Sequence, residues 1–441
     1  MYWFLILVFV LGYLFIALEH SIHVDKAASA ILTGVLCWTI LVFGSGSLLG
    51  AHPELAGHLE ETTHFIDEAL LEHVGEIAEI LFFLLAAMTI VEMIDAHKGF
   101  QVVTDKITTT SRIKLLWIIC TLTFFFSAVL DNLTTAIVMA ALLKKLIHKK
   151  EDLWFFGGMV VIAANAGGAW SPIGDVTTIM LWIGGQITAM NIIITLFIPS
   201  VLCLLLPLLV VTARVKGNIE RPKLSKHSSG HVEQDVSNFE QKFVFWFGVG
   251  GLLFVPVFKS VTHLPPFMGM LLSLGALWVL TELIHRHKAN ESKKGLSVSG
   301  VIRRIDTPSI LFFLGILLAV ASLQTAGHLR DLATILSNQF SSIYIINTFI
   351  GLLSAVVDNV PLVAGAMGMY SLETYAPDNT FWELLAYCAG TGGSALIIGS
   401  AAGVAIMGLL RIDFMWYLKN ISWLALIGYF SGIAFLYLAR G

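Results

Sequence analysis

Charged side chains are scarce in this sequence: Asp, Glu, Lys and Arg make up 13% of its 441 residues. A soluble domain carries about 25% charged residues, so the scarcity excludes an ordinary soluble protein. The four cysteines stand singly in apolar runs without a CxxC pair, which argues against a disulfide framework or a thiolate metal site. Acidic residues outnumber basic ones, 30 to 26, so nucleic acid is not an expected partner. No cofactor is expected either.

Apolar residues, by contrast, make up 57% of the chain and gather in long runs. A hydrocarbon core of about 30 Å requires roughly 20 apolar residues per spanning helix, so these runs predict an all-α polytopic membrane protein. The plain spans that we expect are 2–18, 27–43, 77–95, 192–213, 243–259, 267–284, 308–326 and 414–438.

Two longer segments do not fit a single span. Residues 115–143 and 343–370 are long for one crossing and short for two, and each carries an Asp-Asn pair near its middle, at 131–132 and 358–359. A polar pair at that depth is tolerable only where the surrounding backbone is buried in protein or lines a wet cavity. Both pairs are therefore expected inside the protein.

The distribution of basic residues indicates how these two segments are oriented. Lys and Arg gather at 98–114 and 144–150, on either side of the first segment, and such clusters are typical of cytoplasmic loops. The stretches 44–76 and 331–383 contain no Lys or Arg and should face outward. A segment whose ends lie on one side has not crossed the membrane, so we predict two re-entrant helical hairpins, one from each side, whose tips meet near the midplane.

Two further segments, 153–190 and 382–410, are interrupted by the Gly-rich polar runs NAGGAWSPIGD and GTGGSALIIGS. We expect each to be a broken transmembrane helix. In the first, Asn165 would end one half-helix, Gly167-Gly168 would free the backbone, and Asp175 would begin the next half. The glycine pair is equally compatible with close helix packing, and Asp175 with a simple N-cap.

The two halves of the chain repeat these features in the same order. The matches are LFFL at 81–84 and 311–314, SAVLDN at 127–132 and SAVVDN at 354–359, Gly pairs at 167–168 and 392–393, and single glycines at 174 and 399. The orientation expected from the charges runs the two copies in opposite directions. We therefore predict two inverted-topology repeats, 1–213 and 243–441, joined by a cytoplasmic linker at 214–242, an architecture typical of secondary transporters.

The acidic residue at each tip requires an explanation. Asp and Asn are favoured N-caps, and capping alone could account for Asp131 and Asp358. Ser or Asn would cap equally well without a charge at bilayer depth, which costs a few kcal/mol or more. Two matched aspartates therefore favour an ion-binding function, because carboxylate, amide, hydroxyl and carbonyl oxygens suit both protons and hard cations. A site that binds either ion, exposed alternately to each side, is sufficient for exchange.

We predict that Na⁺, or Li⁺, binds at Asp131 and Asp358 in competition with H⁺. The expected binding residues are Asp131, Asn132, Asp358, Asn359, Asn165, Asp175, Ser127, Thr134, Thr177, Thr178, Ser354, Thr391 and Ser394. A second group, expected to line the pathway or to respond to pH, is Asp306, Glu92, Asp95, Glu76, Glu79 and His73. A solvated helix start explains the last three as well, and an N-cap explains Asp306.

These motifs resemble those of the NhaD-type sodium/proton antiporters of the ion transporter superfamily, over nearly the full length of the chain. The most specific stretches are 76–100, SAVLDNLTTAIVM, 165–182, SAVVDNVP and GTGGSALIIGSAAG. The resemblance implies electrogenic exchange of cytoplasmic Na⁺ or Li⁺ for external H⁺, a bacterial inner (plasma) membrane, with plastid relatives in plants, and often a homodimer. Its essential polar positions fall on Ser127, Asp131, Asn132, Asn165, Asp175, Thr177, Thr178, Asp306, Ser354, Asp358, Asn359, Thr391 and Ser394.

Two other functions remain open on the sequence. A sodium-coupled anion carrier of the dicarboxylate type could use the same scaffold, but acidic tips would repel an anion. Asp131 and Asp358 could also form the dyad of an intramembrane aspartyl protease. That enzyme would leave the repeat and the broken helices unexplained, so no enzymatic activity is expected.

Overall fold

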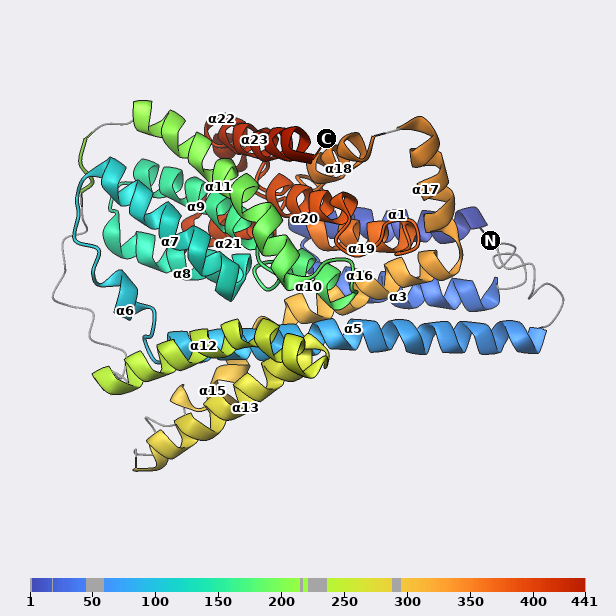
Figure 1. The fold of residues 1–441 in the computed structure, drawn as a ribbon, viewed down its shortest axis with the longest axis horizontal. Helices are drawn as coiled ribbons and strands as arrows, with labels where there is room; N and C mark the ends of the chain where they lie inside the picture. Colours follow the sequence, from blue (N-terminus) through green and yellow to red (C-terminus); the bar gives the residue numbers. More distant parts are fainter. Residues whose placement is uncertain are drawn as a thin grey trace.

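The computed structural model describes residues 2–17, 19–44, 59–214, 217–220, 236–287, 295–340 and 342–440. Throughout these residues the regular elements are helices, and the only β-type pairing is an isolated bridge between Ser111 and Asn218. Figure 1 shows the helices running roughly along the long axis of the molecule, with the amino terminus and the carboxyl terminus on different helical layers. The prediction of an all-α protein is confirmed.

The first half of the chain forms α1 (Tyr2–Ala17), α2 (Glu19–Ile22), α3 (Lys26–Phe43), α5 (Leu59–Ala96), α6 (Gln101–Thr104), α7 (Arg112–Leu130), α8 (Asn132–Leu146), α9 (Lys150–Ala169), α10 (Val176–Ile183) and α11 (Ala189–Arg214). The second half forms α12 (Asn238–Thr262), α13 (Pro266–Ile284), η3 (His285–His287), α15 (Val298–Val301), η4 (Ile302–Arg304), α16 (Thr307–Thr325), α17 (His328–Gln339), α18 (Ile343–Leu353), α19 (Asn359–Met369), α20 (Thr380–Gly392), α21 (Ala401–Leu410), α22 (Phe414–Asn420) and α23 (Ser422–Arg440).

Nine helices in the described residues are long and apolar enough to cross a membrane. They include α7 and α9, which lie in the segments expected as a hairpin and a broken helix, whereas the expected span 2–18 forms the shorter apolar helix α1. Two other expected spans have different bounds. Helix α5 is 38 residues long and begins well before residue 77, because the Glu- and His-containing stretch ahead of the apolar run is also helical. The expected span 414–438 is divided at Ile421, and α21 and α22 are bent by 116° at the break between them.

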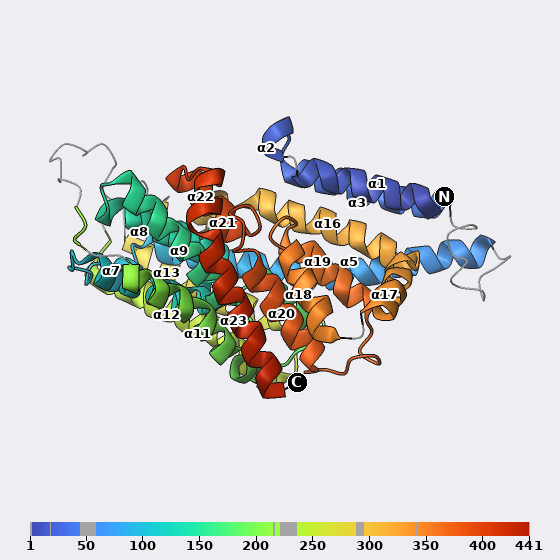
Figure 2. The ribbon, with the colours of Figure 1, turned by 90° about the horizontal axis from the view of Figure 1, so that it is seen from above.

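Helix packing relates elements of the two halves in a matched way. Helix α7 packs on α9 as α18 packs on α20, and α8 packs on α21 as α10 packs on α19. The pair α12–α13 packs on α5, and the pair α1–α3 packs on α16. Figure 2 shows α1 and α3 as an outer layer beside α16, while α12 and α13 lie on α5 in Figure 1. Each helical pair thus covers a long helix of the other half of the chain. That long helix is the one that precedes the Asp-Asn tip of its half.

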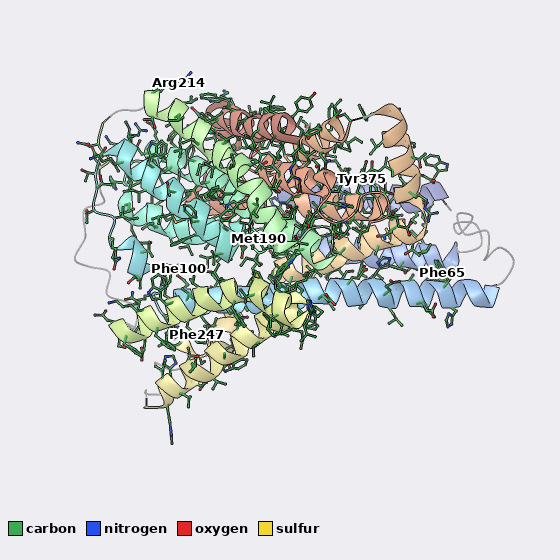
Figure 3. All side chains as sticks on the ribbon, in the orientation of Figure 1. Phe65, Phe100, Met190, Arg214, Phe247 and Tyr375 are labelled. Carbon is green, nitrogen blue, oxygen red and sulfur yellow. The ribbon has the colours of Figure 1, made fainter. Side chains whose placement is uncertain are left out.

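Side chains fill the spaces between these layers. Figure 3 shows Phe100 between the group of helices that contains α7 and the pair α12–α13. Its ring lies 6.1 Å from that of Phe126 on α7 and 6.4 Å from that of Phe245 on α12, measured between centroids. Where α3 crosses α16, by contrast, small residues bring the backbones together: a Cβ added to Gly315 would collide with the backbone of Ala30.

The Gly-rich segments interrupt two helices, but later than the sequence suggested. Helix α9 continues through Asn165 and the glycine pair and ends at Ala169, so Asn165 does not end a half-helix. The glycines serve close packing instead: a Cβ on Gly167 would strike the carbonyl of Phe124, and one on Gly392 would strike that of Gly351. The breaks themselves cover 170–175 and 393–400.

Two regions of the sequence prediction fall partly outside the described residues. In the linker 214–242, residues 221–235 lie outside the described part of the chain. In the stretch 44–76, which was expected to face outward, residues 45–58 do so. After the linker, α12 begins with a capping box in which Ser237 and Glu240 satisfy each other's backbone N–H groups.

Candidate ion-binding site

One buried carboxylate, that of Asp175, lies at the centre of the polar residues. Asp175 is 1% exposed and forms the N-cap of α10. The Thr177 N–H donates to its Oδ1 at 2.9 Å, and the Thr177 hydroxyl donates to the same atom at 2.8 Å. The Thr178 hydroxyl donates to the Asp175 carbonyl at 2.9 Å. Capping therefore explains the position of Asp175, but its carboxylate has further partners: Oδ2 takes no part in the cap, and Oδ1 accepts an additional, longer hydrogen bond.

Those partners are the asparagines of the two Asp-Asn tips. Asn132, the first residue of α8, donates from Nδ2 to Asp175 Oδ2 at 2.5 Å. Asn359, the first residue of α19, donates from Nδ2 to Asp175 Oδ1 at 3.4 Å. Both asparagines are buried. The structure thus brings the matched tips of the two halves to one carboxylate.

Asn165 extends this network to the second broken helix. Its Oδ1 accepts a hydrogen bond from Asn132 Nδ2 at 3.2 Å, and its own Nδ2 donates to the hydroxyls of Ser394 and Ser400, both at 2.9 Å. Ser400 caps α21 as Asp175 caps α10. Ser400 was not among the expected binding residues. It follows the matched glycine of the second half as Asp175 follows that of the first, so the two residues occupy the same position in the repeat.

Asp131 forms the turn between α7 and α8. Its backbone has φ 80° and ψ 161°, a conformation that residues other than glycine rarely adopt. Its two carboxylate oxygens accept hydrogen bonds from the N–H and the hydroxyl of Thr134, each at 2.8 Å. The carboxylate also interacts electrostatically with that of Asp175.

Asp358 has different partners. Its Oδ1 accepts the N–H of Val360 at 3.3 Å, and its Oδ2 lies 3.5 Å from the Nζ of Lys26, the first residue of α3. Asp358 also interacts electrostatically with Asp175. Lys26 was not among the expected residues; its one signal in the sequence is its place at the very edge of an apolar run.

Three expected hydroxyl ligands donate to backbone carbonyls of neighbouring turns. Ser127 donates to Ala164 O at 2.5 Å and Ser354 donates to Ala389 O at 2.9 Å, a matched pair of contacts in the two halves. Thr391 donates to Tyr387 O at 2.6 Å within its own helix. The protons of Ser127 and Ser354 link neighbouring helices, that of Thr391 is used within α20, and only the lone pairs of the three hydroxyls remain for an ion.

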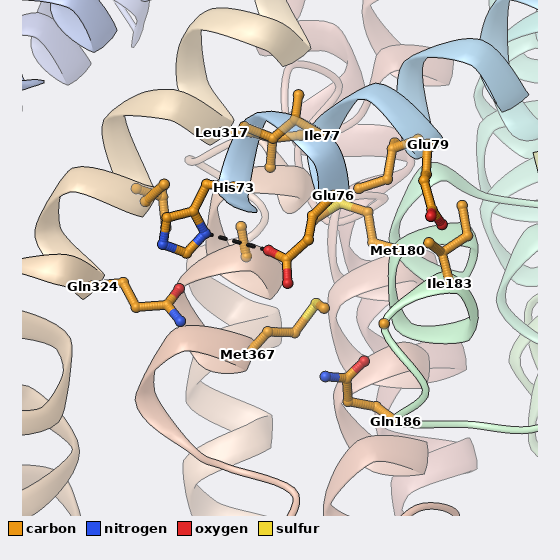
Figure 4. A pocket seen from close by; sticks show the side chains of 15 residues that line it. His73, Glu76, Ile77, Glu79, Met180, Ile183, Gln186, Leu317, Gln324 and Met367 are labelled. Atoms are coloured by element: carbon orange, nitrogen blue, oxygen red, sulfur yellow. Dashed lines mark hydrogen bonds and ion pairs between the residues drawn. The ribbon is translucent and has the colours of Figure 1, made fainter. Parts of the chain in front are cut away.

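A cavity of about 400 Å³ adjoins the middle of α5, and Figure 4 shows its lining. His73 Nδ1 lies 3.3 Å from Glu76 Oε2, and Gln324, Met367 and Gln186 border the same space. Glu79 also lines it. The structure therefore groups His73, Glu76 and Glu79, which were expected to line the pathway or to respond to pH, and adds α10 and α19 as further walls.

A second cavity, of about 100 Å³, adjoins the carboxyl-terminal part of α5. It is lined by Glu92, Asp95, Thr134 and Asp306, and Arg304 Nη1 lies 3.8 Å from Glu92 Oε1. Asp306 itself is an exposed N-cap of α16 whose carboxylate accepts from Ser309. Because Thr134 donates to Asp131, this cavity reaches the wall of the first tip.

The whole arrangement offers oxygens rather than a conventional metal cage. In the part of the chain that the structure describes, no group of three or more His, Cys, Asp and Glu side chains could hold a metal ion. One carboxylate, three asparagine amides and two serine hydroxyls instead converge from the start of α10, from α8, α9 and α19, and from the second break. Such a set suits a transported monovalent cation, which must be released, better than a resident divalent one.

Comparison with known proteins places the chain in a family. The family model described as citrate transporter matches residues 13–384. Sodium/proton antiporter 1 of Arabidopsis thaliana is 48% identical over 97% of this chain and 71% of its own length. Sodium/proton antiporter 2 of the same plant is 43% identical over 97% of each chain. The Na⁺/H⁺ antiporter NhaD of Vibrio cholerae is 29% identical over 97% of this chain and 90% of its own.

The relatives are transporters, and together with the nine apolar helices they establish a multi-pass membrane protein. The chain belongs to the family of the citrate-transporter model and, within it, to the NhaD-type sodium/proton antiporters.

Proposed function

We propose that this protein exchanges Na⁺, or Li⁺, for H⁺ across its membrane by alternating access. The observation that carries the proposal is the convergence of Asn132 and Asn359, from matched tips, on the buried carboxylate of Asp175. The names of the relatives support the identity of the two ions. The protein binds no cofactor in this account and performs no covalent chemistry.

Na⁺ and H⁺ compete for the same oxygens. In the hydrogen-bonded arrangement, the amide N–H groups of Asn132 and Asn359 face the Asp175 carboxylate. Rotation of an amide by half a turn about its last bond would present its oxygen to a cation held by Asp175 and Asp131. A proton on either carboxylate would remove the charge that attracts the cation, so loading with one ion favours release of the other.

The two cavities support access from opposite sides. Glu79 and Glu92 lie 13 positions apart on α5, which corresponds to about 20 Å along the helix, and they line different cavities. One cavity is walled by α10 and α19 and the other by the start of α8. By the distribution of basic residues, the cavity at His73 faces outward and the cavity at Asp95 faces the cytoplasm.

Two inverted repeats, 1–213 and 243–441, complete the proposal. The matched packing of α7 on α9 and α18 on α20 supports them. Helices α18 and α19 have 11 residues each, a rise of about 16 Å, or half a hydrocarbon core. That length suits a re-entrant hairpin over 343–370. Helix α7 has 19 residues, so the hairpin over 115–143 must lie more obliquely.

The cellular setting is proposed from the family. We place the protein in a bacterial inner membrane, with a plastid membrane as the setting of the plant relatives, and we propose a homodimer. The helices α12 and α13 expose apolar side chains such as Trp246, Phe254 and Leu272, which either lipid or a second copy could cover. Fractionation of the source cells and crosslinking in native membranes test these two points.

Ion exchange in proteoliposomes tests the function. Purified protein is reconstituted with a pH-sensitive dye inside, and Na⁺, Li⁺, K⁺, citrate or succinate is added outside at pH values from about 6 to about 10. Na⁺ or Li⁺ should move protons, and neither citrate nor succinate should be taken up, because acidic side chains line the site. Uptake of a carboxylate without cation-driven proton movement would refute the proposal in favour of an anion carrier.

A further inference from the structure

The two tip aspartates, although matched in sequence, have different partners: hydrogen-bond donors at Asp131 and an ammonium at Asp358. In the first half, the N–H and hydroxyl of Thr134 satisfy Asp131. The position that matches Thr134 in the second half is Pro361, which has neither an N–H nor a hydroxyl. The Asp358 carboxylate therefore lacks the donors that Asp131 has, and the Lys26 ammonium lies 3.5 Å from its Oδ2.

Lys26 is held in this place by the fold around it. It begins α3, which packs along α16, and its ammonium lies 4.4 Å from the centroid of the Phe312 ring on α16. Tyr13 of α1 lies against the backbone of Asp358. The Lys26 and Asp358 side chains are 25% and 17% exposed, so water screens their attraction much less than it screens a surface pair.

The surroundings of Lys26 also favour a cation there. Lys26 lines a cavity of about 510 Å³ together with Glu19, Asp25 and Asp306. These three acidic residues around the cavity attract a positive charge to the neighbourhood of Asp358, in addition to the attraction of Asp358 itself.

We propose that Lys26 is the standing counter-charge of Asp358, so that Asp131 and Asp175 are the only carboxylates that hold the transported Na⁺ and H⁺. The inference rests on the proposed exchange function and narrows it. It replaces the expectation that Na⁺ binds at both Asp131 and Asp358. The second tip then contributes the Asn359 amide and an ion pair without net charge, and the first tip contributes the negative charge of Asp131.

A charge-neutral double variant separates this role from direct ion binding. Asp358→Asn alone leaves an unpaired ammonium beside the site. It should raise the Na⁺ concentration for half-maximal exchange at least about tenfold, since a nearby like charge repels the cation. Adding Lys26→Gln to Asp358→Asn removes both charges and should bring that concentration back to within about threefold of the wild-type value. Lys26→Arg should retain the wild-type value, because it keeps the charge.

The measurement is dye-monitored exchange in everted vesicles over a series of Na⁺ concentrations, with half-maximal concentration and maximal rate recorded separately. If the double variant is as impaired as Asp358→Asn, Asp358 is itself a ligand of the transported ion and the inference is wrong. A purely structural role for the pair would lower the amount of folded protein and the maximal rate without changing the half-maximal concentration, and that result would also overturn it.

Thermal unfolding provides a readout that does not depend on transport. In detergent, Lys26→Gln and Asp358→Asn should each lower the melting temperature by more than half of the loss seen in the double variant. The two single losses then add up to more than the loss in the double variant, which shows that the residues are coupled. The matched control is the exposed pair Lys149–Glu220, at 2.9 Å, which should show almost no coupling. Absence of coupling between Lys26 and Asp358 would refute the pair. If the variants show coupling between Lys26 and Asp358 but the wild-type protein exchanges no cation, the proposed function is refuted instead.

Discussion

Asn132 and Asn359, the second residues of two matched Asp-Asn tips, both donate to the carboxylate of Asp175. The two residues begin α8 and α19, helices from opposite halves of the chain, and Asp175 begins α10. Three helix starts therefore meet at one point, and helix starts carry partial positive charge. That partial charge stabilises the buried carboxylate of Asp175.

Asp175→Asn should lower Na⁺-driven exchange at least about tenfold, because one charged oxygen ligand is lost while Asn still caps the helix. The control is Asp413→Asn, which changes another N-cap, on α22, whose carboxylate accepts from the Trp416 N–H. Exchange in everted vesicles, normalised to protein content, is the measurement. Equal activity of the Asp175 variant and the control would contradict a role in ion binding.

Asp131→Asn should abolish exchange, although the protein still inserts and folds. The Thr134 N–H can still donate to the remaining amide oxygen, so the turn is preserved, but the carboxylate that interacts with Asp175 is gone. Size-exclusion profile and melting temperature report the fold, and Na⁺-driven dye response reports exchange. A variant that exchanges ions at near the wild-type rate would remove Asp131 from the site.

Asn132→Ala should weaken Na⁺ binding more than Asn359→Ala does. Asn132 lies 2.5 Å from Asp175 and also contacts Asn165, whereas Asn359 lies 3.4 Å from Asp175. Loss of a hydrogen bond to a charged group typically costs about 1.5–3 kcal/mol, so the half-maximal Na⁺ concentration should rise about tenfold or more for Asn132→Ala. The reverse order of the two variants would show that the second tip is the principal one.

Gly167→Ala and Gly392→Ala should each destabilise the protein by about 1–3 kcal/mol, because a Cβ at either position meets a backbone carbonyl that has no room to move. Gly250→Ala and Gly365→Ala are matched controls in helices where a Cβ meets open space. Melting temperatures in one detergent compare the four variants. Similar stability of all four would mean that α7 and α18 do not approach the broken helices closely.

The sequence predicted the tips but not the residue on which they converge. The repeated SAVxDN motif, with its charge at bilayer depth, indicated that Asp131-Asn132 and Asp358-Asn359 lie inside the protein, and the structure brings both asparagines together. It does so through Asp175, which the sequence ranked as one ligand among many, since spacing along the chain does not report which side chain of a broken helix faces inward.

Lys26 and the two altered spans had weaker signals. The contact of Lys26 with Asp358 depends on how the pair α1–α3 stacks on α16, a long-range packing that no local pattern reports. The turn at Ile421 follows Lys419 and Asn420, a polar pair inside an otherwise apolar run, and the expected span was drawn across that pair. The glycine pair in α9 was read as a break because glycine disfavours helices, whereas close contact with α7 outweighs that preference here.

Calorimetry of Na⁺ binding to purified protein tests competition between Na⁺ and H⁺ most directly. Titrations in buffers with different ionisation enthalpies measure the protons released, and by linkage the apparent dissociation constant should fall as the pH rises, by at most about tenfold per pH unit for each proton displaced. This account predicts proton release on Na⁺ binding in the wild-type protein and its loss in Asp175→Asn. Na⁺ binding without proton release, at an affinity independent of pH, would contradict it.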